Sequence, residues 1–148
     1  MNRITFIASL LLGYKVVLDI GTDHGLVLKK AFDLKYIQKG IASDIKTQPL
    51  HCAYQNLKHY PVEFYLSDGF QKISSSFDLA LICGMGAHTI IHILTQVPYL
   101  TKPLILGCQS KWSPLIDWLK QNNFSILNYY SFYDKFNYFF LKVIRLSK

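Results

Sequence analysis

The chain has 148 residues, of which 51% are hydrophobic and 17% charged, a balance that predicts one globular domain and excludes intrinsic disorder. Its formal net charge of +7 favours an acidic partner, with nucleic acid the first candidate. The three cysteines, at distant positions, form no C-x-x-C pair, so the sequence indicates neither a disulfide framework nor a zinc site. We therefore expect a cytoplasmic protein without a bound metal.

The first apolar segment, residues 4–12, follows Arg3 and is similar in length to the core of a signal peptide. No small-residue cleavage site follows it, and it is shorter than the ~20 residues that span a bilayer. Its apolar residues recur with helical spacing and Gly13 comes directly after them. We predict a helix that packs on the core, and no membrane partner.

From residue 15 onward, short apolar runs alternate with amphipathic segments, which predicts a parallel sheet with helices on both faces. The expected strands are residues 15–20, 40–43, 62–66, 77–83 and 104–106. The expected helices are residues 25–34, 47–59 and 113–122, a short one at 70–73, and one that ends near Val97. Pro98 and Pro103 are expected to bracket a loop.

The end of the chain has a different pattern. Residues 124–133 and 136–146 read as two long strands, and Asp134-Lys135 between them is a hairpin signal. A seven-stranded sheet with this ending is the architecture of class I methyltransferases that use S-adenosylmethionine (SAM), whereas nicotinamide-binding domains usually end without it. We therefore expect an α/β, Rossmann-like, mostly parallel sheet with a C-terminal antiparallel hairpin.

The loop after the first predicted strand has the strongest chemical pattern. Gly21 and Gly25 allow a sharp turn and a close approach of a ligand, and the following helix points its amides at the same place. Asp19 disfavours a phosphate there and favours a cationic or hydroxyl-bearing ligand, which suits the nucleoside and charged amino-acid arm of SAM. The spacing Gly21-x-x-x-Gly25 does not meet the dinucleotide fingerprint G-x-G-x-x-G.

Polar or glycine-rich residues also follow the next three predicted strands: Asp44, Asp68-Gly69 and Gly84-Met85-Gly86. Because the carboxyl ends of parallel strands meet at one edge of a sheet, we expect them to lie near the first loop. Asp44 falls where an acid takes ribose hydroxyls, and Asp68 where a side chain meets the adenine amino group. Each acid alone is typical of a turn or helix N-cap, so the predicted site depends on the four endings together.

These four segments resemble the successive motifs of the bacterial tRNA (adenine(22)-N(1))-methyltransferases, the TrmK family. They are Asp19-Ile20-Gly21-Thr22-Asp23-His24, Ile41-Ala42-Ser43-Asp44, Ser67-Asp68-Gly69-Phe70 and Ile82-Cys83-Gly84-Met85-Gly86. The resemblance implies SAM as cofactor, tRNA as substrate and methyl transfer to N1 of an adenine. The residues that it implies for SAM binding are Asp19, Gly21, Thr22, Asp23, His24, Asp44, Asp68, Gly69 and Gly84. Those that it implies for positioning the methyl group and the acceptor are Gly84, Met85 and Gly86.

The chain departs from the family's pattern in three places. Ala87 stands where the family has a second glycine after Met, and residues 106–110 replace its Leu-Gln-Pro-Asn-like segment. The family's helical C-terminal extension has no counterpart in the sequence, so we expect residues 1–148 to form a single methyltransferase domain without it. The missing extension and the altered segment keep open a non-catalytic SAM- or RNA-binding module. A further alternative is an oxidoreductase that binds NAD with Asp44 on the ribose, although the missing G-x-G-x-x-G and the hairpin count against it. The sequence predicts no oligomeric state.

Overall fold

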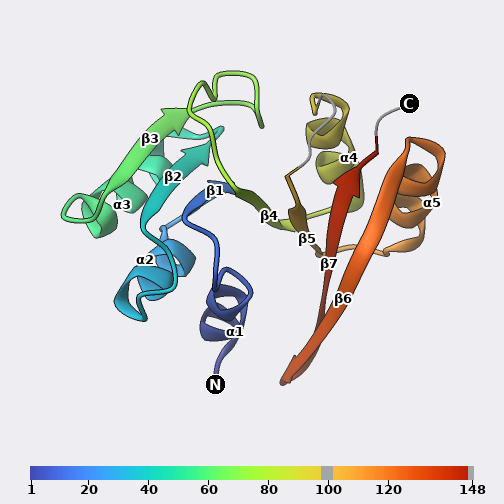
Figure 1. Ribbon diagram of the computed structural model, residues 1–148, viewed down its shortest axis with the longest axis horizontal. Coiled ribbons are helices and arrows are strands. Elements are labelled where there is room, and N and C mark those ends of the chain that lie inside the picture. Colours follow the sequence, from blue (N-terminus) through green and yellow to red (C-terminus); the bar gives the residue numbers. More distant parts are fainter. Residues whose placement is uncertain (98–101, 147–148) are drawn as a thin grey trace.

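The computed structural model describes residues 1–97 and 102–146, which form a seven-stranded sheet in the order β3-β2-β1-β4-β5-β7-β6 with helices on both faces (Figure 1). The parallel strands are β1 (Val16–Ile20), β2 (Lys39–Asp44), β3 (Val62–Leu66), β4 (Leu79–Met85) and β5 (Leu104–Cys108). The antiparallel hairpin is β6 (Phe124–Asp134) and β7 (Phe136–Arg145). The helices are α1 (Arg3–Ser9), α2 (Leu26–Asp33), α3 (Thr47–Leu57), α4 (Ala87–Thr95) and α5 (Ser113–Gln121).

Two hydrophobic cores lie on opposite faces of the sheet, because successive side chains of a strand point to opposite sides. In β4, Ala80 and Ile82 pack with α4 and α5, whereas Leu79 and Leu81 pack with α1, α2 and α3. The central strands bury both faces, which explains why their sequences are almost continuously apolar. The predicted fold class is therefore confirmed.

The strand order reverses between β1 and β4, which are parallel neighbours although two other strands separate them in the chain. β1 pairs with β2 on its other side. In doubly wound sheets, ligands bind at the carboxyl ends of the strands beside such a reversal. The topology thus places the loops after β1 and β4 at the centre of the carboxyl edge.

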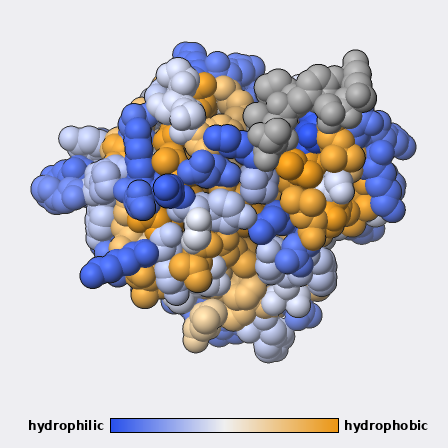
Figure 2. Space-filling model, viewed as in Figure 1, coloured by the Kyte–Doolittle hydropathy of each residue, from blue (hydrophilic) through white to orange (hydrophobic). Residues whose placement is uncertain are grey.

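The hairpin projects beyond this edge. The register of β5 with β7 ends at the pair Leu106↔Leu141, whereas β6 and β7 remain paired as far as Asp134↔Phe136. The large hydrophobic side chains that β6 and β7 expose are Ile126, Leu127, Tyr129, Tyr133, Phe136 and Phe139. Figure 2 shows one face of the molecule, on which hydrophobic side chains lie exposed between hydrophilic ones.

Two sequence predictions were wrong in detail. Residues 70–73 form turns in place of a short helix, because their amides bond to side chains: Phe70 N donates to Gln96 Oε1 (2.7 Å) and Lys72 N donates to Ser67 Oγ (3.0 Å). The fourth strand begins at Leu79, not at residue 77, and continues through Met85, which pairs with Cys108 of β5. Of the loop expected between Pro98 and Pro103, residues 98–101 lie outside the described residues.

Candidate functional site

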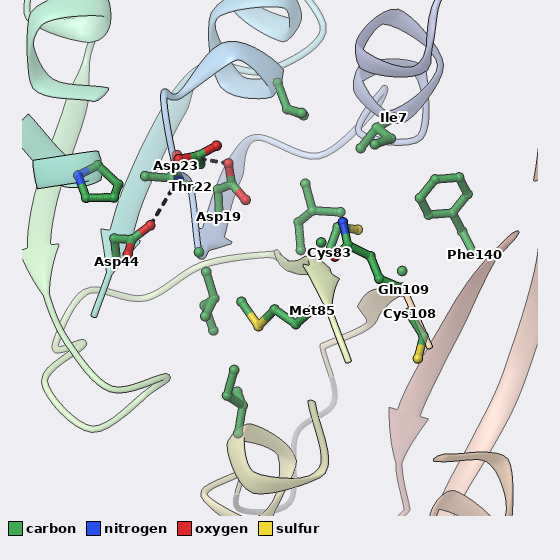
Figure 3. A pocket seen from close by; sticks show the side chains of 18 of the residues that line it. Ile7, Asp19, Thr22, Asp23, Asp44, Cys83, Met85, Cys108, Gln109 and Phe140 are labelled. Carbon is green, nitrogen blue, oxygen red and sulfur yellow. Dashed lines mark hydrogen bonds between the residues drawn. The ribbon is translucent and has the colours of Figure 1, made fainter. Parts of the chain in front are cut away.

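A cleft of about 1230 Å³ runs along the carboxyl edge of the sheet (Figure 3). The loops after β1, β2, β3, β4 and β5 all line it. The sequence predicts that the first four of these loops meet at this edge. The predicted site residues that line the cleft are Asp19, Gly21, Thr22, Asp23, His24, Asp44, Asp68, Gly69, Gly84 and Met85. Gly86 is absent from its lining.

Asp19 is the buried carboxylate of the cleft, with only 5% of its surface exposed. Its Oδ2 accepts a hydrogen bond from Thr22 Oγ1 at 3.0 Å, which explains why a hydroxyl residue follows three positions later. The pKa of Asp19 is raised to about 7, chiefly by burial and also by the nearby Asp44 and Asp23 carboxylates, while the hydrogen bond from the Thr22 hydroxyl opposes the shift. A cationic group beside Asp19 would relieve this cost of ionisation.

Asp44 ends β2 at the same end of the cleft and is also buried. Its two carboxylate oxygens accept hydrogen bonds from the backbone amides of Asp23 (Oδ2, 3.1 Å) and Lys46 (Oδ1, 3.1 Å). These bonds hold the carboxylate in one orientation and join the loop after β1 to the loop after β2. Each oxygen keeps a further lone pair, so Asp44 can still accept from two hydroxyls of a ligand.

Gly21 makes room for Met85, which Figure 3 places beside the acidic residues. Gly21 has φ +73°, and a Cβ built on it would lie 2.3 Å from Met85 Cε. The left-handed conformation favours glycine here, and a larger residue would also displace the end of the methionine side chain that lies over it. Met85 thus connects the predicted cofactor loop with the predicted acceptor loop.

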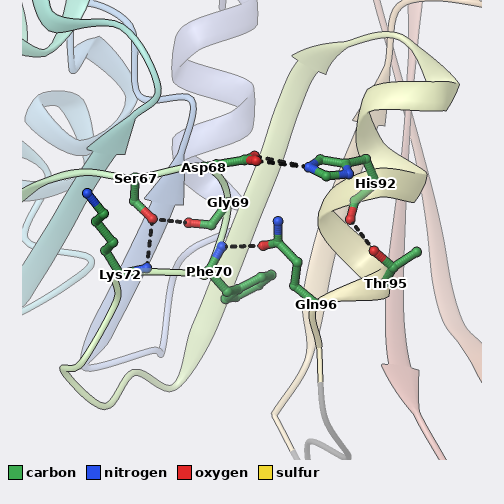
Figure 4. Close-up of polar contacts among 8 residues, drawn as sticks. All are labelled: Ser67, Asp68, Gly69, Phe70, Lys72, His92, Thr95 and Gln96. Atoms are coloured by element: carbon green, nitrogen blue, oxygen red, sulfur yellow. Dashed lines mark hydrogen bonds and ion pairs between the residues drawn. The ribbon is translucent and has the colours of Figure 1, made fainter.

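Asp68 follows β3 and lines the cleft, as expected, and it also has a partner within the protein. Its carboxylate points to His92 of α4, with Nε2–Oδ2 3.0 Å and Nε2–Oδ1 3.2 Å (Figure 4). The neighbouring Gly69 lies against Gln96, because a Cβ there would be 2.4 Å from Gln96 Oε1. One face of α4 therefore holds the loop after β3, a role for His92 and Gln96 that sequence reasoning missed.

The loops after β4 and β5 are bonded to each other. Gly84 is the extra residue of a bulge between the pairs Cys83↔Gly107 and Met85↔Cys108, and it has φ +80°. Gln109 N donates to Met85 O (2.8 Å), and Ala87 N donates to Ser110 Oγ (2.9 Å). The chain's own segment after β5 thus supports the Gly84-Met85-Gly86 turn.

The far end of the cleft consists of residues that the sequence did not mark. Arg3, Ile4 and Ile7 of α1 and Asn137, Tyr138, Phe139 and Phe140 of β7 line it. In Figure 3, Ile7 and Phe140 lie to the right of Cys83, and the cluster of Asp19, Asp23 and Asp44 lies to its left. The segment Asp134-Lys135-Phe136-Asn137-Tyr138 resembles the ending of the TrmK family, but that resemblance assigned no site role to it, because its position beside the cleft depends on how far the hairpin overhangs the sheet.

Histidines 88 and 92 are four residues apart on α4, a spacing that zinc sites also use. Within residues 1–97 and 102–146, no group of three or more His, Cys, Asp or Glu side chains is arranged to hold a metal ion. His92 instead contacts Asp68. None of the described helices has the length and apolar character that crossing a bilayer requires.

Comparison with known proteins agrees with this geometry. The family described as "Methyltransferase domain" matches residues 1–141. A curated Mycoplasma pneumoniae protein named "Putative tRNA methyltransferase" is 34% identical over 131 residues, which are 84% of this chain and 62% of that protein. The chain thus spans about three fifths of that relative's length.

Solved structures share the fold. M. capricolum TrmK, in complex with S-adenosyl-homocysteine (SAH), superposes with a TM-score of 0.85 at 23% identity, over 98% of this chain and 68% of that one. The B. subtilis m1A22 tRNA methyltransferase TrmK superposes with a TM-score of 0.86 at 21% identity, over 97% of this chain and 65% of that one. The strand order, the glycine loop on the carboxyl edge and the match over residues 1–141 lead to one assignment: the chain belongs to the methyltransferase-domain family.

Proposed function

We propose that the protein is a SAM-dependent tRNA methyltransferase that acts on N1 of an adenine, position 22 by family resemblance. The observation that supports SAM most directly is the acidic end of the cleft, where Asp19 and Asp44 lie at the carboxyl ends of the adjacent strands β1 and β2. The donor set fits the cofactor: Asp44 offers two oriented oxygens to ribose hydroxyls, and Asp19 offers a buried carboxylate to the cationic amino-acid arm. When bound, SAM supplies an electrophilic methyl group on its sulfonium.

The distribution of charge supports RNA as the substrate. The chain carries a net charge of +7, although four aspartates, Asp19, Asp23, Asp44 and Asp68, line the cleft. Carboxylates at the cleft repel a phosphate and attract a cation, whereas the excess of lysine elsewhere attracts a polyanion. The relatives' names, which describe them as tRNA methyltransferases, also support RNA as the substrate.

Methyl transfer to adenine N1 depends little on acid or base groups of the protein. Adenine N1 has a free lone pair and attacks without prior deprotonation, so the protein's main task is to hold N1 in line with the methyl group and sulfur. N1 lies on the pairing edge of the base, so the adenine must be unpaired or flipped out. The residues proposed to position the reacting atoms are Gly84, Met85 and Gly86, of which Gly84 and Met85 line the cleft.

The proposal is tested by incubating the protein with methyl-labelled SAM and an unmodified tRNA, and then analysing the nucleosides. We expect label in 1-methyladenosine, and its absence after mutation of the target adenine to guanine. Binding of SAM without any labelled nucleoside would favour the non-catalytic SAM-binding module. Label in a different nucleoside would retain the enzyme but reject adenine N1.

The pKa of Asp19 gives a second prediction. A cationic arm beside Asp19 favours the ionised carboxylate, so binding must remove the proton that Asp19 holds below its pKa of about 7. We expect SAM affinity to fall up to about tenfold per pH unit as the pH drops below 7. Titration calorimetry from pH 5.5 to 8 measures this slope.

The Asp19→Asn variant is the control, because it keeps the shape and the bond to Thr22 but cannot ionise. It should bind SAM weakly with a flat pH profile; a wild-type profile that is equally flat would contradict the role of Asp19.

The free energy of unfolding should depend on pH in the opposite direction to SAM affinity, so it should fall as the pH rises. The raised pKa of Asp19 contributes stability that is complete below the unfolded value of 3.8 and is lost as the pH rises through about 7.

A further inference from the structure

The overhanging part of β7 forms one wall of the cleft. Phe136 to Phe140 lie beyond the last β5–β7 pair, Leu106↔Leu141, and at about 3.3 Å per residue they extend roughly 16 Å past it. Asn137, Tyr138, Phe139 and Phe140 line the cleft. A strand that has left the sheet but still borders the cleft is placed to contact a molecule that enters it.

The two faces of this overhanging segment have different neighbours. One face packs on α1: the rings of Phe6 and Phe132 stack at 4.7 Å, and the Arg3 guanidinium lies 5.4 Å from the centre of the Tyr138 ring. On the other face, Phe139 stacks on Tyr129 with ring centres 6.0 Å apart. These two rings remain 38% and 56% exposed, so a supported aromatic surface is open beside the cleft.

The chemical character of this end of the cleft differs from that of the other end. The four carboxylates that line the cleft lie at the carboxyl ends of β1, β2 and β3 or just after them, with Lys46 beside them, whereas β7 contributes the amide Asn137 and aromatic rings. Gln109, after β5, adds a second exposed amide. Rings and amides suit a nucleotide base, because bases stack on rings and amides pair with base edges.

We propose that Tyr129, Asn137 and Phe139, here called the acceptor wall, bind the unpaired nucleotide of the RNA substrate. Its base stacks on Phe139, which Tyr129 supports from behind, and Asn137 faces the base edge. This inference builds on the proposed function and adds the acceptor subsite to it. It explains why phenylalanine and tyrosine stay exposed where the cleft opens, and why α1 braces the opposite face of the hairpin.

The test compares Phe139→Ala, Phe139→Tyr and Tyr54→Ala. Tyr54 is a matched control, because it is 48% exposed and packs on another ring, Phe64, at the far edge of the sheet. Fluorescence anisotropy measures the binding of a short single-stranded RNA that contains adenine, with SAH present, and a tRNA assay measures kcat/KM. Phe139→Ala should weaken RNA binding and lower kcat/KM by about 5- to 150-fold, the range for one lost stacking contact.

SAM affinity should stay at the wild-type level in Phe139→Ala, and Phe139→Tyr and Tyr54→Ala should keep RNA binding. Phe139→Ala and Tyr54→Ala each lose one ring contact, so they should lower thermal stability to a similar, small extent. If Phe139→Ala binds RNA like the wild type, or loses SAM affinity as well, the acceptor wall is wrong even when the wild type methylates tRNA. If RNA binding depends on Phe139 but the wild type forms no 1-methyladenosine, the wall is supported and the proposed reaction fails. A wild-type protein that binds no RNA would overturn the acceptor wall.

Discussion

Replacement of Asp44 by alanine is expected to weaken SAM binding by about 1.5–3 kcal/mol, roughly 10- to 150-fold in Kd. Asp44 is buried at the end of β2, and both of its oxygens are oriented by backbone amides. Without the carboxylate, the ligand hydroxyl can donate only to water, which is a weaker acceptor than a charged oxygen. Titration calorimetry with SAM measures the change.

The result needs a control, because the same carboxylate also joins two loops. Asp44→Asn keeps one oxygen acceptor but loses the charge, and should fall between the wild type and Asp44→Ala. Asp33→Ala removes an exposed aspartate on α2 whose Oδ1 accepts from Tyr60, and should leave SAM affinity unchanged. If a folded Asp44→Ala protein binds SAM as tightly as the wild type, Asp44 does not hold the ribose.

The carboxyl-edge residues could be predicted because their placement needs only the strand order of an α/β sheet. Once Asp19 and Asp44 end neighbouring parallel strands, topology brings them together without any knowledge of packing. Gly21 was predictable in the same way, although the sequence could not show that Met85 lies over it. Local patterns therefore identified the half of the cleft that is formed by loops.

The other half depends on tertiary packing. Gln96 accepts from Phe70 N across 26 residues, and that contact replaces the short helix expected at residues 70–73. The position of Phe139 beside the cleft follows from the register of β7 against β5, which no periodicity in the hairpin specifies. Contacts of this kind are set by how whole elements pack, so the sequence placed the loop residues of the cleft better than the residues of the hairpin.

Replacement of Gly84 by valine is expected to lower methyl transfer by about 10²-fold or more, while SAM still binds. Gly84 has φ +80° at the bulge of β4, where a β-branched residue is strained, and it lines the cleft. A Cβ there meets nothing nearer than Gln109 Nε2 at 3.8 Å, so the conformation, not a lack of space, requires glycine. Relief of the strain should shift Met85 and the acceptor by a distance on the order of 1 Å, which is enough for such a loss.

Gly86 supplies the matched control within the same turn. Its φ of −75° and ψ of 166° are open to any residue, and a Cβ there makes ordinary contacts with Ser110 at 3.6 and 3.9 Å. Gly86→Ala should therefore keep SAM affinity and thermal stability close to wild type, which makes it the control for backbone strain. The methylation rate of Gly84→Ala, which is strained but not β-branched, should fall between those of Gly84→Val and the wild type.

If Gly84→Val folds and methylates tRNA at the wild-type rate, the turn after β4 does not position the reacting atoms, and the acceptor must approach from elsewhere. If Gly84→Val loses SAM binding and stability together, the bulge serves the fold and not the alignment of N1 with the methyl group.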